Sequence, residues 1–253
     1  MDVTQQNYYE DTGHMSVSAF KKFMKCEVDG LKGFTGESSI PMLVGSYVDS
    51  YVEGTLEQFK EEHPEIIAKT GKTKGELKSD FKQADEICSY IDNNNLIQQF
   101  LSGDKQTIMT GVIGGVPFKS KMDSYLKGTL IADLKIMRTV TDSNGNFYDF
   151  VTKWGYDIQL ACYQEIVYQN TGERLPCYIV AITKESPINS VIIKIPQNIL
   201  DRALYLVESN IERIWEVKQG KTEAVGCGIC SSCIEARTET PIISLDTIME
   251  GVI

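Results

Sequence analysis

Apolar residues recur at helical spacing in the first hundred residues of the chain, and they alternate with polar residues in several segments after residue 103. Residues 41–62 place valine, leucine and phenylalanine on one helical face, and residues 79–100 repeat this pattern. A shorter helix is predicted to begin after Ser16, whose hydroxyl suits an N-cap. Residues 1–15 show no periodicity, and we expect them to form a flexible arm.

The alternating segments predict strands, because side chains of a strand point in turn to its two faces. Three predicted strands come in succession, and two more follow a helical segment. In chain order these elements are strands at 107–113, 116–126 and 129–136, a helix at 156–168, strands at 178–182 and 190–195, and a helix at 196–220. This order predicts an α/β fold with a small mixed β-sheet flanked by helices and with a helical N-terminal part.

Two residues that could take part in catalysis share one face of the predicted strand at 129–136. Leu130, Ala132 and Leu134 form its apolar side, so Asp133 and Lys135 emerge together on the opposite side. Carboxylate oxygens suit Mg²⁺, which polarises a phosphodiester oxygen and lowers the pKa of a bound water, and an adjacent lysine orients or deprotonates that water. The pattern also fits an ordinary solvated strand face, because Asp-Leu-Lys is a common tripeptide.

The turn between the two strands decides whether Asp123 joins this pair. A two-residue turn would place Met122 opposite Asp133 and direct Asp123 to the other face. A three-residue loop that ends at Gly128 would pair Asp123 with Ile131, diagonal to Asp133 and about 7 to 8 Å from it between backbones. Glycine suits the left-handed position that such a loop requires, so we predict the three-residue loop.

The segment VPFKSKMDSYLKGTLIADLK resembles motifs II and III of the RecB-like branch of the PD-(D/E)XK nucleases. WGYDIQLACYQEI resembles the helical Q-x-x-x-Y motif of that branch, and it places Gln159 and Tyr163 one helical turn apart. GSYVDSYVEG resembles its G-x-x-x-His motif, with Asp49 where the family usually has a metal-binding histidine. The resemblance implies a restriction-endonuclease-like core, catalytic roles for Asp123, Asp133, Lys135, Gln159 and Tyr163, and metal ligation by Asp49, Asp123 and Asp133.

The function that this resemblance implies is that of an Mg²⁺- or Mn²⁺-dependent DNA exonuclease. Within the branch, the chain is most similar to phage RecE-like enzymes of the exodeoxyribonuclease VIII type. Their properties imply degradation of linear double-stranded DNA in phage-type recombination, a single-strand annealing protein as partner and a ring-shaped homo-oligomer. The alternatives are a structure-specific or single-strand RecB-like nuclease and a catalytically inactive DNA-binding scaffold.

Three of the seven cysteines lie at C-x-x-C-x-x-C spacing, namely Cys227, Cys230 and Cys233. This spacing is typical of metal ligands, although free thiols are the alternative. The segment SVSAFKKFMKC resembles the N-terminal element of RecB-like nucleases with an iron-sulfur cluster, which implies that Cys26 is the fourth ligand. The ligand set fits a [4Fe-4S] cluster or Zn²⁺, and the resemblance favours the iron-sulfur cluster.

The net charge of −10 is unusual for a nucleic-acid-binding protein, because lysine and arginine usually provide the contacts to phosphate. Acids clustered around a metal would reconcile the charge with DNA binding. With only two histidines, His14 and His63, and no suitable partners for a triad, hydrolases with a nucleophilic serine or cysteine are disfavoured. No apolar run is long enough to cross a membrane, so we expect a cytoplasmic protein of a bacterium or phage-infected cell.

The predicted elements and motifs fit one nuclease domain over residues 16–233. Its predicted parts are the helical part at 16–103, the catalytic core at 104–220 and a cysteine-rich closure at 221–233. Residues 234–253 are predicted to follow as a C-terminal tail.

Overall fold

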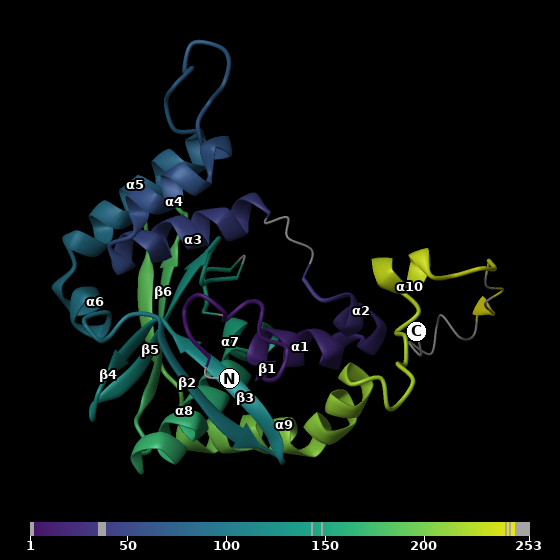
Figure 1. Ribbon diagram of the computed structural model, residues 1–253. Coiled ribbons are helices and arrows are strands. Elements are labelled where there is room, and N and C mark those ends of the chain that lie inside the picture. Colours follow the sequence, from purple (N-terminus) through teal and green to yellow (C-terminus); the bar gives the residue numbers. More distant parts are fainter. Residues whose placement is uncertain are drawn as a thin grey trace.

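Two β-sheets lie at the centre of the computed structural model, which describes residues 3–34, 39–142, 144–147, 149–240, 242, 244 and 245 (Figure 1). The larger sheet has the strand order β4-β5-β6-β7, from Ser124–Leu126, Leu130–Met137, Cys177–Thr183 and Ser190–Lys194. Strands β5 and β6 are parallel, and the outer pairs are antiparallel. The smaller sheet has the order β1-β3-β2, from Met15–Ser16, Val116–Met122 and Thr107–Ile113. The predicted α/β fold is confirmed.

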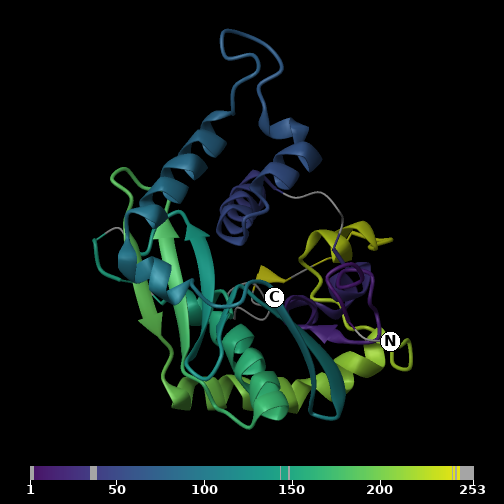
Figure 2. The same cartoon turned by 60° about the vertical axis from the view of Figure 1, so that its left-hand side comes forward.

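Helices cover both faces of the larger sheet. On one face pack α3 (Ile40–Glu53), α4 (Leu56–Glu62) and α5 (Ser79–Asp92). On the other face packs α8 (Tyr156–Thr171), and α9 (Gln197–Lys218) packs against α8 (Figure 2). Shorter helices of the described chain are α1 (Val17–Lys25), α2 (Glu27–Lys32), the 3₁₀ helix η1 (Pro64–Ile66), α6 (Asn95–Phe100), α7 (Phe150–Lys153) and α10 (Ser231–Glu235).

Side chains of β5 alternate between two hydrophobic clusters, as the sequence predicts. Ala132 and Leu134 are buried against α3 and α5, whereas Ile131 is buried on the side of α8. Asp133 and Lys135 therefore belong to the α8 side of the sheet. One face of β5 is therefore apolar, and the other carries the charged pair beside a buried isoleucine.

The predicted register of the hairpin is wrong by two residues. Tyr125 pairs with Ile131 and Leu126 with Leu130, so the loop consists of residues 127–129 instead of 126–128. Gly128 does adopt a left-handed conformation, with a φ of 68°. Because a shift of two residues preserves the face of every side chain, Asp123 still lies on the face of Asp133.

Three long elements of the prediction are interrupted in the structure. The predicted strand 116–126 divides at a bend at Asp123 into β3 and β4. The predicted helix 41–62 divides at Gly54, whose φ of 78° ends α3. The predicted helix 79–100 divides before Asn94, whose side chain accepts a hydrogen bond from the backbone N–H of Ile97 and so caps α6. In both helical regions a residue suited to a cap overrides the continuing apolar period.

The N-terminal segment lies against the smaller sheet. Lys119 of β3 is only 4% exposed, and its ammonium group donates hydrogen bonds to the carbonyl oxygens of Tyr8 and Asp11, at 2.5 and 2.7 Å. The same group pairs with the Asp11 carboxylate at 3.0 Å. These contacts connect a segment that the sequence predicts to be a flexible arm with the strand that leads to Asp123. Residues 1 and 2 of that arm and part of the predicted tail at 234–253 lie outside the described residues.

Helix α2, near the start of the chain, and helix α10, near its end, meet beside α9. Helix α10 packs on α2, and the Arg213 guanidinium of α9 binds both carboxylate oxygens of Glu27 at 2.8 and 2.9 Å. Figure 2 shows this corner on the opposite side of the molecule from the larger sheet. Among the described helices, none has the length and apolar character that a membrane crossing requires.

Candidate active site

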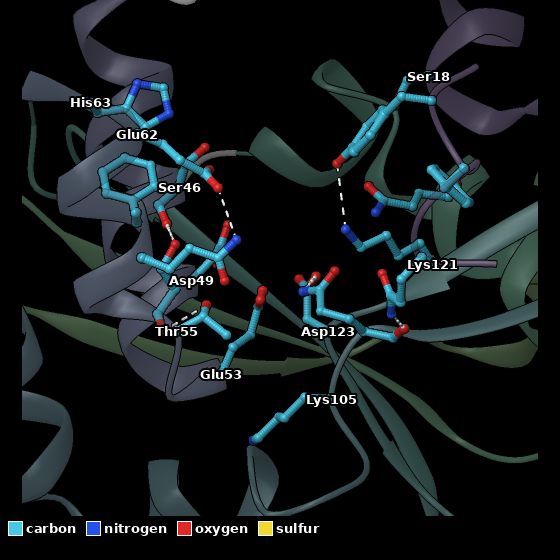
Figure 3. A pocket seen from close by; sticks show the side chains of 18 of the residues that line it. Ser18, Ser46, Asp49, Glu53, Thr55, Glu62, His63, Lys105, Lys121 and Asp123 are labelled. Atoms are coloured by element: carbon cyan, nitrogen blue, oxygen red, sulfur yellow. Dashed lines mark hydrogen bonds between the residues drawn. The ribbon is translucent and has the colours of Figure 1, made fainter.

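A cavity of about 940 Å³ opens between α3 and the end of β3 (Figure 3). Its lining is strongly polar, and the N-terminal segment, α3, α4, β3 and α8 all contribute to it. Residues that line it include Gln5, Tyr8 and Tyr9 of the N-terminal segment, Asp49 and Glu53 of α3, Glu62 of α4, Lys121 of β3, Asp123 at the bend, and Gln159 and Tyr163 of α8. Asp49 and Glu53 approach the cavity from one side and Lys121 from the other (Figure 3).

The bend after β3 directs the Asp123 carboxylate towards β5. Its Oδ2 accepts a hydrogen bond from the backbone N–H of Leu134 at 3.0 Å, and its Oδ1 accepts one from Gln106 at 3.4 Å. Gln106 has a φ of 49°, which is uncommon for a residue other than glycine. The carboxylate is thus held beside the strand that carries Asp133, as the sequence predicts.

Asp133 and Lys135 form an ion pair in the interior. The Asp133 side chain is 2% exposed, the Lys135 side chain 20%, and the Lys135 ammonium contacts Oδ2 of Asp133. The other carboxylate oxygen, Oδ1, accepts a hydrogen bond from Gln159 Nε2 at 2.8 Å. A charge buried this deeply is costly unless it is paired, and both oxygens of Asp133 have a partner of suitable polarity.

Gln159 and Tyr163 connect the two strands of the site through α8. The Gln159 amide donates to Asp133 and also lies 3.0 Å from the Tyr163 hydroxyl. That hydroxyl donates to the backbone carbonyl of Lys121 at 2.9 Å. The one-turn spacing of the two residues therefore serves to fix Asp133 relative to the end of β3.

The carboxylates repel one another, and this repulsion appears in their pKa values. Burial, followed by the charges of Asp133 and Glu53, raises the pKa of Asp49 to about 7 against the opposing attraction of Lys135. Burial and the charges of Asp133 and Asp49 also raise the pKa of Asp123 well above its ordinary value. Burial by itself would lower the pKa of Lys135, but the carboxylates of Asp133 and Asp123 outweigh it and raise that pKa.

The oxygen donors of this set are of the type that binds a divalent cation, although the ligand atoms of Asp49, Asp123 and Asp133 do not all lie within 4.8 Å of one another as those of the four predicted cysteine ligands do. The crowding of three carboxylates, which contributes to the raised pKa values of Asp49 and Asp123, would be relieved by a double positive charge, and hard oxygen ligands are those that Mg²⁺ and Mn²⁺ prefer. Asp49 occupies the position that the family motif gives to histidine, and it faces the cavity from α3 as that role requires (Figure 3). Asp49, Asp123 and Asp133 are the residues that would hold such an ion.

Several polar residues of the site were not predicted from the sequence. Lys121 lies two residues before Asp123, so the two-residue period of a strand could have indicated that both side chains share one face. Glu53 lies one helical turn after Asp49 and could have been found in the same way. Gln106, Tyr8 and Tyr9 belong to segments without periodicity, and only the folded chain brings them to the cavity.

The four predicted cysteine ligands come together at the meeting of the chain ends. Within the described chain they are the one group of three or more cysteine, histidine or acidic side chains whose ligand atoms all lie within 4.8 Å of one another. The Cys26 sulfur is 3.5 Å from that of Cys233 and 3.6 Å from that of Cys230. Cys227 completes the group, so four thiols from both ends of the chain can hold a metal.

The surroundings of this cluster lower the pKa values of Cys26 and Cys227, whereas burial and the neighbouring cysteines raise the pKa of Cys230. Burial alone would raise the pKa of Cys26, but hydrogen bonds from the backbone N–H groups of Cys227 and Asp29 outweigh it and lower this pKa to about 6. A side chain at Gly226 would meet the Cys233 sulfur at 2.9 Å, so glycine allows the close approach. Because thiolates are the metal-binding form of cysteine, the site suits a cation.

Comparison with known proteins yields a family and a close structural relative. Residues 16–236 match the family model described as "PDDEXK-like domain of unknown function (DUF3799)". The crystal structure of a protein from Eubacterium rectale, named "Putative exonuclease", is similar to this chain at 43% sequence identity over 99% of each chain, with a TM-score of 0.90. None of the curated proteins compared with the chain matches it.

A second solved structure, SSO0001, shares 12% sequence identity over 81% of this chain and 89% of its own. Its TM-score of 0.30 is too low to support an argument about the fold.

Asp49→Asn is expected to stabilise the metal-free protein at pH 8 by an amount on the order of 1 to 3 kcal/mol, with little effect near pH 4. The folded state keeps the Asp49 proton up to about pH 7, whereas the unfolded chain loses it near pH 3.8. Wild-type stability therefore falls as the pH rises through this window, and the asparagine variant lacks that loss. Urea unfolding in EDTA at several pH values measures the difference, with the exposed Glu61→Gln of α4 as control. A variant whose advantage stays constant from pH 4 to pH 8 would contradict the assignment.

Proposed function

The chain is an enzyme of the PD-(D/E)XK nuclease superfamily and belongs to its PDDEXK-like domain family. From this premise we propose that it is a divalent-metal-dependent exonuclease that acts on linear double-stranded DNA. The observation that carries the proposal is the gathering of Asp49 and Asp123 at one cavity, next to the buried pair of Asp133 and Lys135. These residue types are those that metal-assisted phosphodiester hydrolysis requires.

Each residue of the site has a distinct task in this proposal. When bound, the cation would polarise the phosphodiester and the attacking water. Asp49, Asp123 and Asp133 bind and centre it. Lys135, whose ammonium contacts Asp133, orients or deprotonates the attacking water and stabilises developing negative charge. Gln159 and Tyr163 hold Asp133 in position.

The exonuclease activity and the wider biological role are argued by similarity. The relative from Eubacterium rectale is named "Putative exonuclease", and 43% identity over 99% of both chains supports the same activity here. The motifs around Asp123 and Asp133 support a RecE-like role in phage-type recombination, in the cytoplasm and together with a single-strand annealing protein.

A ring-shaped homo-oligomer would explain how a chain with a net charge of −10 retains DNA. A ring can line its channel with the minority of basic side chains and direct acidic ones outward. Light scattering that finds a monomer under conditions of active cleavage would remove this part of the proposal.

The cysteine cluster is proposed to be a structural metal site that joins the chain ends. Family resemblance supports a [4Fe-4S] cluster. The spacing of the sulfur atoms supports zinc, because four thiolates about 2.3 Å from one ion stand roughly 3.8 Å apart in a tetrahedron. The distances of 3.5 and 3.6 Å from the Cys26 sulfur are close to that value, and four iron atoms between the thiolates would need a wider arrangement. We therefore favour a single tetrahedral ion.

The purified protein is expected to degrade end-labelled linear duplex DNA in the presence of Mg²⁺ and to leave closed circular duplex intact. EDTA should abolish the reaction, because it removes the cation that would polarise the phosphodiester and the attacking water. Gel analysis of both substrates measures this. Cleavage of circles would instead favour a structure-specific nuclease, and inactivity on every duplex and single-stranded substrate would favour a DNA-binding scaffold.

Asp133→Asn and Lys135→Ala are each expected to lower the cleavage rate by ~10³-fold or more, because each removes a charge that acts at the reacting phosphate. Lys127→Ala changes an exposed lysine in the turn of the same hairpin and is the matched control. Single-turnover rates measure the effect, and circular dichroism checks folding. Full activity of a folded Asp133→Asn or Lys135→Ala variant would refute the assigned role.

Metal analysis of anaerobically purified protein is expected to find one zinc per chain and no visible charge-transfer absorbance. Cys230→Ser should lose the metal and loosen the contact between α2 and α10, because only three thiolates remain. Cys88→Ala, which alters a buried cysteine between α5 and its neighbours, should retain the metal. Iron and inorganic sulfide with a visible absorbance band would overturn the zinc assignment in favour of the iron-sulfur cluster.

A further inference from the structure

The cavity has two chemically different walls. Asp49, Glu53 and Glu62 form an acidic wall on α3 and α4. Across the cavity, the N-terminal segment contributes Tyr8 and Tyr9. Binding of the proposed cation explains the acidic side chains, but it gives no role to the two tyrosines.

Tyr9 is an exposed aromatic side chain at this catalytic cavity. It is 82% exposed, although tyrosine usually buries most of its ring. Its ring meets that of Tyr8 edge to face, with centroids 5.3 Å apart and planes at 85°. Tyr8 therefore supports the Tyr9 ring, most of whose surface remains open to solvent.

The aromatic wall is held in place by the interior of the protein. The buried Lys119 ammonium binds the backbone carbonyl of Tyr8 and lies 4.8 Å from the centre of its ring. Gln5 donates to the carbonyl of Gln106 at 2.6 Å, and Gln106 in turn binds Asp123. The N-terminal segment is thus connected to the acid at the centre of the site.

A cationic group accompanies the exposed ring. The Lys121 ammonium lies 5.2 Å from the centre of the Tyr9 ring and 3.4 Å from its hydroxyl oxygen. An exposed aromatic ring beside a lysine, in a cavity that is proposed to bind the scissile phosphate, matches the chemistry of a nucleotide, whose base stacks and whose phosphate carries charge. A peptide or lipid would not require both features next to a metal site.

We propose that Tyr9 stacks against an unpaired nucleobase at the end of the DNA strand being degraded, with Lys121 contacting the adjacent phosphate. The inference rests on the proposed nuclease function and specifies how that site holds its substrate. Stacking tolerates every base because each has a π face, so it suits an enzyme that must advance through any sequence. Tyr9 is a substrate-binding residue in this assignment.

The test combines variants of Tyr9 with substrates that lack one base. Linear duplexes carry a single abasic nucleotide at each of the first positions of the degraded strand in turn. For wild type, one such position should raise KM roughly tenfold, with a smaller change in kcat. Tyr9→Ala should raise KM for the intact substrate by a similar factor and lose the discrimination, whereas Tyr9→Phe should keep it because the ring remains. Tyr205→Ala removes a 70% exposed tyrosine of α9 outside the cavity and should behave as wild type.

Fluorescence anisotropy in EDTA, with the same labelled duplexes, measures binding without cleavage. It should show the same loss of discrimination for Tyr9→Ala. Wild-type protein indifferent to every abasic position, or Tyr9→Ala that still discriminates, would overturn the stacking assignment. Absence of cleavage by wild type would reject the nuclease proposal instead, and the binding data would still decide whether Tyr9 stacks on a base.

Discussion

The site is organised around the ion pair of Asp133 and Lys135, which β5 buries between two helical layers. Charges in such a position are tolerated only when each is compensated. Lys135 neutralises one oxygen of Asp133, and Gln159 hydrogen-bonds to the other. Further hydrogen bonds hold Gln159 in place, since Tyr163 contacts Gln159 and also binds the backbone of β3. Helix α8 is thereby fixed on the sheet by polar contacts as well as by its apolar side chains.

The same pair leaves a charge imbalance that a cation would correct. One lysine faces three carboxylates, and two of these, Asp49 and Asp123, have raised pKa values as a result of burial and mutual repulsion. A metal-free site of this kind costs stability at neutral pH, and a divalent ion turns the repulsion into attraction. The arrangement that makes the metal-free state unfavourable is therefore the one that favours metal binding. This relation connects the energetics of the fold to the proposed chemistry.

Contacts between distant parts of the chain complete the cavity. The N-terminal segment reaches it because Lys119 binds that segment to β3. Shortly after this segment, Cys26 meets the three cysteines near the other end of the chain. A metal at that cluster would fix α2 against α10 and so restrain the region from which α1 and the N-terminal segment extend. The cysteine cluster and the active site are separate, yet both depend on how the chain ends are held.

The sequence by itself determined the α/β class and the shared face of Asp133 and Lys135. Strand alternation is a local property of the backbone, and it survives a register error of two residues, so Asp123 was placed on the right face by a wrong pairing. The apolar pattern of the sequence did not predict the helix breaks at Gly54 and Asn94, where local capping overrides a continuing apolar period. Tertiary structure alone decided the aromatic wall of the cavity, the hydrogen bond from Gln106 and the raised pKa of Asp49. These features arise from side chains that are close in space but far apart in sequence, and no period along the chain records such proximity.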